Sequence, residues 1–283
     1  MEKLDRLGWA VGMAFVVYGV HVGIRVNKVD ALERLKTCLP PVWKPISSAR
    51  VDLLYSFILG GAGSRPGVRR FNLLYGNADR LVRTLNLDEV FDVFESSLHF
   101  QIAETARRRL FVHAGVVGWR GRAILMPGRS HSGKSTLVAA LVRSGATYYS
   151  DEYAVLDAAG RVHPYPKPLS LRDRAAGKAT RYPAEALGGT VGNRPLPVGL
   201  VVVSQYKPDA AWRPRRLSAG RGVLALLANT VSARRQPASA LAILQRVATH
   251  AVTVKGGRGE AKEVAPRLLD YLGRFCNHAD IAR

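Results

Sequence analysis

The 283-residue chain is poor in cysteine, in acidic residues and in long apolar runs. Its two cysteines, Cys38 and Cys276, form no CxxC motif, which favours incidental thiols in a reducing compartment over a disulfide. The apolar N-terminal run GWAVGMAFVVYGVHVGI is shorter than the ~20 residues that a membrane-spanning helix needs. Basic residues precede this run, but no small-residue cleavage site follows it. We therefore expect a cytoplasmic protein with no membrane association.

The charge is strongly one-sided, with 42 basic against 21 acidic residues and a net charge of +21. Such a balance fits an anionic partner, or else an arginine-rich proteome combined with a phosphate-handling site. The basic residues are spread along the chain, and the short runs at 107–109 and 212–216 are not interleaved with aromatic residues. We therefore do not expect a nucleic acid partner.

Hydropathy patterns divide the chain near residue 108. Residues 1–108 are expected to form an α+β segment of unknown role, and residues 109–283 a second domain. In the first segment we expect strands at 12–27, 50–59 and 68–77, and helices at 29–40, 78–85 and 87–109. In the second we expect strands at 110–119, 122–128, 146–157, 196–206 and 251–257, and helices at 134–145, 221–231, 238–251 and 260–274.

The stretch LMPGRSHSGKST at residues 125–136 contains Gly-x-x-x-x-Gly-Lys-Ser. A strand precedes it and a helix follows it, which is the context that a phosphate-binding loop requires. Gly128 and Gly133 let the backbone curl so that successive N–H groups point inward. Lys134 reaches the outer phosphates, and the hydroxyl of Ser135 is placed to ligate Mg²⁺. The expected nucleotide contacts are Gly128, Arg129, Ser130, His131, Ser132, Gly133, Lys134, Ser135 and Thr136.

Two further features supply candidate catalytic groups. The acidic pair Asp151 and Glu152 comes one helix and one strand after the loop lysine, so the chain can return beside the loop. One carboxylate would hold Mg²⁺, and the other would accept a hydroxyl proton or orient the attacking group; an exposed acidic turn is the alternative. His113, on the strand before the hairpin at 120–121, is a catalytic candidate or a core histidine.

The stretch FVHAGVVGWRGRAILMPGRSHSGKSTLVAALVRSGATYYSDEYAVL resembles the core of the HPr kinase/phosphorylase family. It also resembles the wider group of related small serine kinases, which includes those that phosphorylate precursor peptides in lasso-peptide pathways. The resemblance covers roughly residues 110–160, with a looser match to about 172. It implies an α/β fold with a P-loop kinase core of PEP-carboxykinase type, a mixed sheet with flanking helices.

The resemblance also implies roles for individual residues. Asp151 corresponds to the base that deprotonates a serine hydroxyl, and Glu152 to a metal-side partner, although the two roles could be exchanged. His113 would interact with phosphate or with the acidic pair. Arg172, in PLSLRD, stands where a phosphate- or substrate-contacting arginine is expected. Glu152 and Thr136 differ from the family pattern, which indicates a divergent branch.

The sequence therefore predicts an ATP- and Mg²⁺-dependent kinase that phosphorylates a serine-type hydroxyl of a protein, a peptide or a small molecule. The catalytic candidates are Asp151, His113 and Lys134, and the metal candidates are Ser135, Asp151 and Glu152. A regulatory module that binds a nucleotide with little turnover is the alternative. The relatives form oligomers, so the resemblance is compatible with a homo-oligomer.

Overall fold

The structure, a computed structural model, describes residues 5–47, 50–62, 69–128, 132–172 and 179–279. The chain divides into two compact units, Met1–Arg108 and Arg109–Arg283. Each unit combines helices with a mixed sheet, so the mixed α/β class expected from the sequence is confirmed. Within the described residues, no helix combines the length and the apolarity that crossing a bilayer requires.

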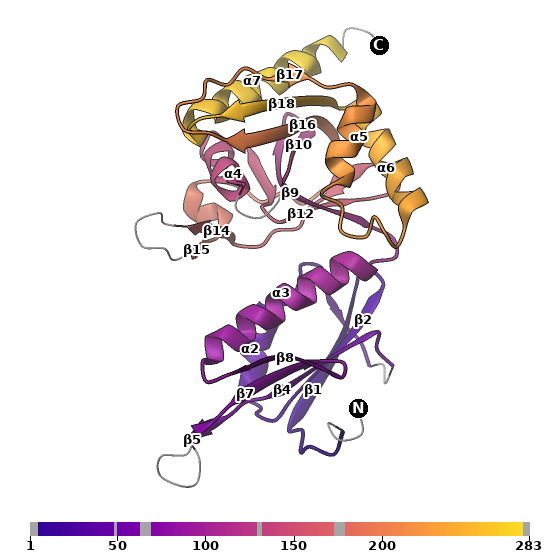
Figure 1. The fold of residues 1–283 in the computed structure, drawn as a ribbon, viewed down its shortest axis with the longest axis vertical. Coiled ribbons are helices and arrows are strands. Elements are labelled where there is room, and N and C mark those ends of the chain that lie inside the picture. Colours follow the sequence, from indigo (N-terminus) through magenta and orange to yellow (C-terminus); the bar gives the residue numbers. More distant parts are fainter. Residues whose placement is uncertain (1–4, 48–49, 63–68, 129–131, 173–178, 280–283) are drawn as a thin grey trace. The chain divides into compact units, whose positions relative to one another are not determined.

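The first unit is built on a six-stranded sheet in the order β3-β1-β2-β4-β7-β8 (Figure 1). The pair β2–β4 is parallel, and the other neighbouring strands are antiparallel. The elements are β1 Val11–Val17, β2 Val20–Val26, α2 Ala31–Thr37, β3 Lys44–Pro45, β4 Leu53–Ile58, β5 Gly61–Ala62, β6 Arg69–Arg70, β7 Asn72–Gly76, β8 Asp79–Thr84 and α3 Leu87–Thr105.

Helix α3, predicted from its apolar periodicity, is confirmed. Its start is capped by Asn86, whose side-chain oxygen accepts a 2.9 Å hydrogen bond from the N–H of Asp88, as N-cap residues do. Its apolar face is buried on the sheet, where the ring of Phe94 makes edge contacts with Tyr55 and Phe57. The core of this unit therefore lies between α3 and the sheet.

Two expectations in this unit are wrong. Residues 12–27 are not one strand but the hairpin β1–β2, which turns at Tyr18 and Gly19 with positive φ at both residues. Residues 78–85 are not a helix but the edge strand β8. Asn77 adopts a left-handed turn (φ 53°) and hydrogen-bonds the backbone of Leu54. This turn returns the chain antiparallel to β7, and ladder bonds then outweigh a weak helix propensity.

The second unit contains an eight-stranded mixed sheet (Figure 1). The pairings β9–β12–β13–β16–β10–β9 close on themselves, while β11 is added on β9 and β18 and β17 extend from β16. The elements are β9 Leu110–Trp119, β10 Arg122–Pro127, α4 Lys134–Arg143, β11 Thr147–Ser150, β12 Tyr153–Leu156, β13 Arg161–His163, β14 Leu169–Arg172, β15 Ala179–Tyr182, β16 Leu196–Tyr206, β17 Arg215–Arg216, α5 Ala219–Leu227, α6 Pro237–His250, β18 Val252–Arg258 and α7 Ala261–Ala279, with a 3-10 turn at Ala184–Leu187.

Helices cover this sheet in two pairs. Apolar residues of α4 and α7 belong to one buried core, and those of α5 and α6 to another. The predicted hairpin between β9 and β10 is confirmed, with left-handed Arg120 and Gly121 at its turn. The predicted single strand at 146–157 is instead broken into β11 and β12. The break occurs because the hydroxyl of Ser150 accepts hydrogen bonds from the backbone N–H groups of Glu152 and Tyr153. These two N–H groups therefore cannot bond to a neighbouring strand.

Candidate functional site

The predicted phosphate loop, which starts at Gly128 and ends at Gly133, begins where β10 ends. Pro127, the last residue of β10, pairs with Ala114 of β9, and the N–H of Gly128 donates to the carbonyl of His113 at 3.2 Å. The antiparallel neighbour therefore holds the start of the loop in place. Three of the predicted nucleotide contacts lie outside the described residues: Arg129, Ser130 and His131.

Gly133 ends the loop in a left-handed conformation (φ 82°) and is the N-cap of α4. A side chain at this position would be strained by that φ and would collide with the guanidinium of Arg258, so glycine is required here. The helix that follows presents its free N–H groups and the positive end of its dipole to the loop. Among the other loop residues, Ser132 and Ser135 are half-buried and Thr136 is exposed.

Lys134 folds across the loop from the first turn of α4. Its Nζ donates a 2.7 Å hydrogen bond to the carbonyl of Gly128, so the lysine bridges the two ends of the loop. Burial lowers its pKa to about 8, although the negative charges of Asp151 and Glu152 oppose this effect. Burial thus disfavours the charged form of the ammonium group, and an added anion would stabilise that form.

Asp151 lies buried at the break between β11 and β12. Its carboxylate accepts hydrogen bonds from the N–H of Ser170 at 3.2 Å and from the hydroxyl of Tyr148 at 3.3 Å. Ser135 of the loop also hydrogen-bonds it. Burial raises the pKa of Asp151, the bonds from Ser170 and Ser135 lower it, and the negative charge of Glu152 raises it again. The ionised carboxylate is thus a stronger proton acceptor than an exposed aspartate.

Glu152 is half-buried beside Asp151. Its backbone carbonyl accepts the N–H of Ala114, which ties this residue to β9. Its carboxylate forms a 2.7 Å ion pair with the Nζ of Lys167, and its charge acts on Lys134. The acidic pair is therefore divided: Asp151 contacts the loop serine, and Glu152 contacts a lysine from beyond β13.

His113 lies on β9 directly beside the loop and opposite Tyr153 of β12. The backbone N–H of His113 donates a hydrogen bond to the carbonyl of Asn229 at 2.7 Å. Its pKa is lowered to about 4 by burial and by the positive charge of Lys134, while a hydrogen bond with the backbone of Gly128 opposes the shift. The imidazole is therefore neutral at pH 7 and unsuited to neutralising phosphate as a cation.

Sequence reasoning missed Arg258, the last residue of β18. Its Nη2 donates a 2.7 Å hydrogen bond to the carbonyl of Gly133, and its Nη1 donates to the carbonyl of Gly259 at 3.3 Å. The guanidinium is almost fully buried and lies 5.6 Å from the ring centroid of Tyr206. A signal was available, because VTVKGG was predicted as a strand, and the carboxyl ends of parallel strands meet at one edge of a sheet.

Arg172 was predicted to contact phosphate or substrate, but its side chain is not among those that the structure describes. Its strand, β14, nevertheless reaches the site, because the N–H of Ser170 donates to Asp151. The structure adds Tyr148 and Lys167, which are joined by a 2.6 Å hydrogen bond from the tyrosine hydroxyl to the lysine carbonyl. These two residues contact the acidic pair, and neither was a candidate from the sequence.

The structure brings the predicted groups to one end of β10. Within the described residues, no group of three or more histidine, cysteine, aspartate or glutamate side chains forms a metal site. The hydroxyl of Ser135 and the carboxylate of Asp151 are oxygen donors of the kind that Mg²⁺ prefers, and Mg²⁺ at such sites completes its shell with phosphates and water. The donor set therefore fits Mg²⁺ held jointly by the protein and a nucleotide.

Comparisons with known proteins add no assignment. No protein-family model matches this chain, and the search of curated proteins finds no significant relative.

Proposed function

We propose that this protein transfers the γ-phosphoryl group of ATP, with Mg²⁺, to a serine-type hydroxyl of a protein, a peptide or a small molecule. The observation that carries the proposal is the contact between Ser135 of the phosphate loop and the buried carboxylate of Asp151, beside Lys134. The buried carboxylate can accept a hydroxyl proton as well as ligate Mg²⁺, so the site contains a base that a phosphoryl transfer to a hydroxyl would use. The resemblance of residues 110–160 to the HPr kinase/phosphorylase family supports the same chemistry.

The loop and Lys134 would bind the phosphates. Burial lowers the pKa of this lysine, and a phosphate oxygen, which would stabilise its charged form, could replace the carbonyl of Gly128 as its partner. The N–H groups at the start of α4 would contribute further donors. Lys134 is already held at the loop by its bond to Gly128, and donors positioned in advance would favour electrostatic stabilisation of a transition state.

Asp151 and Glu152 would divide the remaining work. Ser135 and the acidic pair would hold Mg²⁺, which would supply positive charge against the charge that develops on the phosphates. Asp151 would accept the proton of the acceptor hydroxyl, since burial strengthens it as a base. Glu152, held by Lys167, would lie on the metal side. Neutral His113 would orient the start of the loop through the backbone of Gly128.

The proposal is tested with labelled ATP, Mg²⁺ and a panel of hydroxyl acceptors that includes proteins, serine-containing peptides and small alcohols. We expect the label to appear on an acceptor hydroxyl, with release of ADP. Binding of ATP without transfer to any acceptor would contradict the proposal and would favour the regulatory alternative.

A further inference from the structure

A cavity in the unit Arg109–Arg283 lies at the end of the sheet away from the predicted phosphate loop. It has a volume of about 660 Å³ and is lined by the first residues of β10, β16 and β18. These three strands run parallel, so their amino ends share this edge while their carboxyl ends lead to Gly128 and Arg258. None of the candidate catalytic residues lines this cavity.

Basic side chains from three elements converge on the cavity. Arg122 comes from β10, Arg161 from β13, and Arg246 and His250 from the last turns of α6. None of the residues that line the cavity is acidic. Arg161 is paired with Asp157 through a 3.0 Å contact from Nε, but no described acidic side chain pairs with Arg122 or Arg246. The cavity therefore holds uncompensated positive charge, which attracts anions.

Apolar side chains form much of the cavity wall, and a glycine in the wall makes room for the side chain of Arg122. Val198, Val247 and Leu272 are buried lining residues. Gly199 of β16 carries no side chain, and a Cβ there would lie 2.7 Å from Leu272 and 2.9 Å from the Cδ atom of Arg122. The glycine thus lets the methylene groups of Arg122 cross the strand, as close approaches in sheets require.

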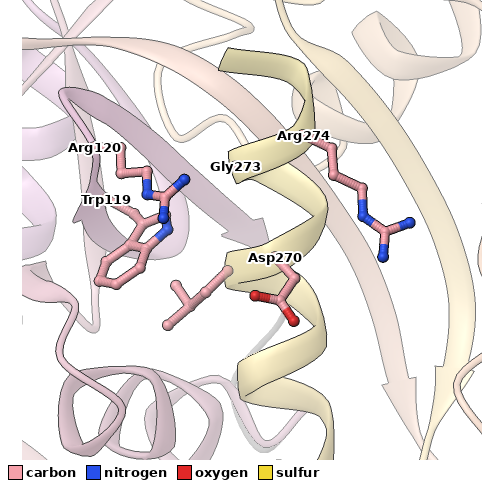
Figure 2. Close-up of a pocket in the computed structure, with 6 residues that line it drawn as sticks. Trp119, Arg120, Asp270, Gly273 and Arg274 are labelled. Carbon is pink, nitrogen blue, oxygen red and sulfur yellow. The ribbon is translucent and has the colours of Figure 1, made fainter. Parts of the chain in front are cut away.

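A neighbouring cavity, shown in Figure 2, provides a contrast. It has a volume of about 300 Å³ and lies between helix α7 and two residues of the β9–β10 hairpin, Trp119 at the end of β9 and Arg120 in the turn. Asp270 lines it together with Arg274, so its basic groups share the space with a carboxylate. The larger cavity has both more room and no acid, and its volume is within the range of small-molecule sites.

We propose that this basic cavity is a binding site for a small organic anion, one that combines a phosphate or carboxylate group with an apolar body of about the size of two fused rings. Arg122 and Arg246 bind the anionic group, and the valine and leucine side chains contact the apolar body. This site is independent of the phosphate loop and of the proposed kinase activity.

The experiment titrates the full chain with 1-naphthyl phosphate, 1-naphthoate and uncharged 1-naphthol, with binding followed by naphthalene fluorescence. We expect at least one of the two anions to bind with a submillimolar Kd, and 1-naphthol to bind at least tenfold more weakly. The tighter of the two anions assigns the head group as phosphate or carboxylate. Equal binding of 1-naphthol, or no anion binding below 1 mM, overturns the proposal.

Variants locate the site. Arg246→Gln, the double variant Arg122→Gln/Arg246→Gln, and Ala159→Trp at the exposed rim should each weaken anion binding, the double variant at least tenfold through loss of charge-assisted bonds. The double variant Arg221→Gln/Arg234→Gln removes the same charge from exposed positions outside the cavity and should bind normally, as should Lys134→Ala. The proposal is overturned if binding is lost only in Lys134→Ala, or if it is kept in every cavity variant.

Ala159→Trp changes an exposed residue and leaves the core intact, so a loss of binding in this variant cannot be explained by misfolding of the kind that could affect the arginine variants.

Discussion

The guanidinium of Arg258 donates a 2.7 Å hydrogen bond to the carbonyl of Gly133, 125 residues earlier in the chain. This bond joins the end of the last strand, β18, to the residue that caps the helix of the phosphate loop. The arginine is almost fully buried, and burial lowers its pKa although Glu260 and Tyr206 oppose the shift. The buried guanidinium of Arg258 therefore helps to hold Gly133, and with it the end of the loop, in its observed conformation.

Replacing Arg258 with alanine should weaken ATP binding about tenfold, because the carbonyl of Gly133 loses its charged donor. Arg258→Lys should restore part of the affinity, since it keeps a charge but not the planar fork of donors. Nucleotide affinity is measured by calorimetric titration. Arg221→Ala, at an exposed position of α5, is the matched control and should bind normally. An unchanged affinity in Arg258→Ala would show that the loop keeps its shape without this bond.

Gly133→Ala should lower both stability and nucleotide affinity, because alanine is strained at φ 82° and its Cβ would displace Arg258. We expect a loss of about 1–2 kcal/mol in the free energy of unfolding. Gly220→Ala, in helix α5 with open space around it, should be neutral or stabilising by up to about 1 kcal/mol. Urea unfolding of both variants compares them directly, and equal effects would contradict the prediction.

Asp151→Asn should reduce phosphoryl transfer by about 10²–10⁴-fold, the usual contribution of a general base. Asparagine keeps the size of the side chain, can still accept the bond from Ser170 and retains an oxygen donor for Mg²⁺, so ATP affinity should fall far less than phosphoryl transfer. The measurements are single-turnover transfer and equilibrium binding on the same preparation. Glu185→Gln, at an exposed position of the same unit, controls for removal of one acidic charge. Undiminished transfer in Asp151→Asn would exclude this residue as the base.

Binding of ATP near pH 8.5 should be accompanied by proton uptake at Lys134. The pKa of this lysine is about 8 in the free protein, so much of it is neutral at that pH, and a bound phosphate favours the charged form. Calorimetry in buffers of different ionisation enthalpy measures the protons taken up. The effect should vanish in Lys134→Met at ATP concentrations that still give binding, and a persistent uptake would assign it to another group.

His113 should make the protein less stable in mild acid. Its pKa is about 4 in the folded state against an ordinary value of about 6.5, so the unfolded chain binds more protons between these values. The free energy of unfolding therefore falls as the pH drops from about 6.5 to about 4. Urea unfolding across this range should show a smaller slope for His113→Gln than for wild type. A slope in His113→Gln equal to that of the wild type would assign the acid sensitivity to other groups.

Local patterns in the sequence were sufficient for the parts of the site that lie close together in the chain. The strand, glycine loop and helix around Lys134 follow from apolar runs and from glycines at the required spacing. The β9–β10 hairpin follows in the same way, and it places His113 beside Gly128 by antiparallel pairing alone. The same local reasoning failed at 78–85, where a single turn residue, Asn77, decided between helix and strand.

Only the tertiary structure decided the contacts between distant segments. Arg258 meets Gly133 because β18 pairs in parallel with β16, and β16 with β10, and no short-range pattern specifies which strands become neighbours. The bond from Ser170 to Asp151 depends in the same way on where β14 lies. The basic cavity is formed by residues of α6, β10 and β13 that no motif connects. Sequence alone thus determined the chemistry of the loop, whereas long-range strand pairing determined which charges surround it.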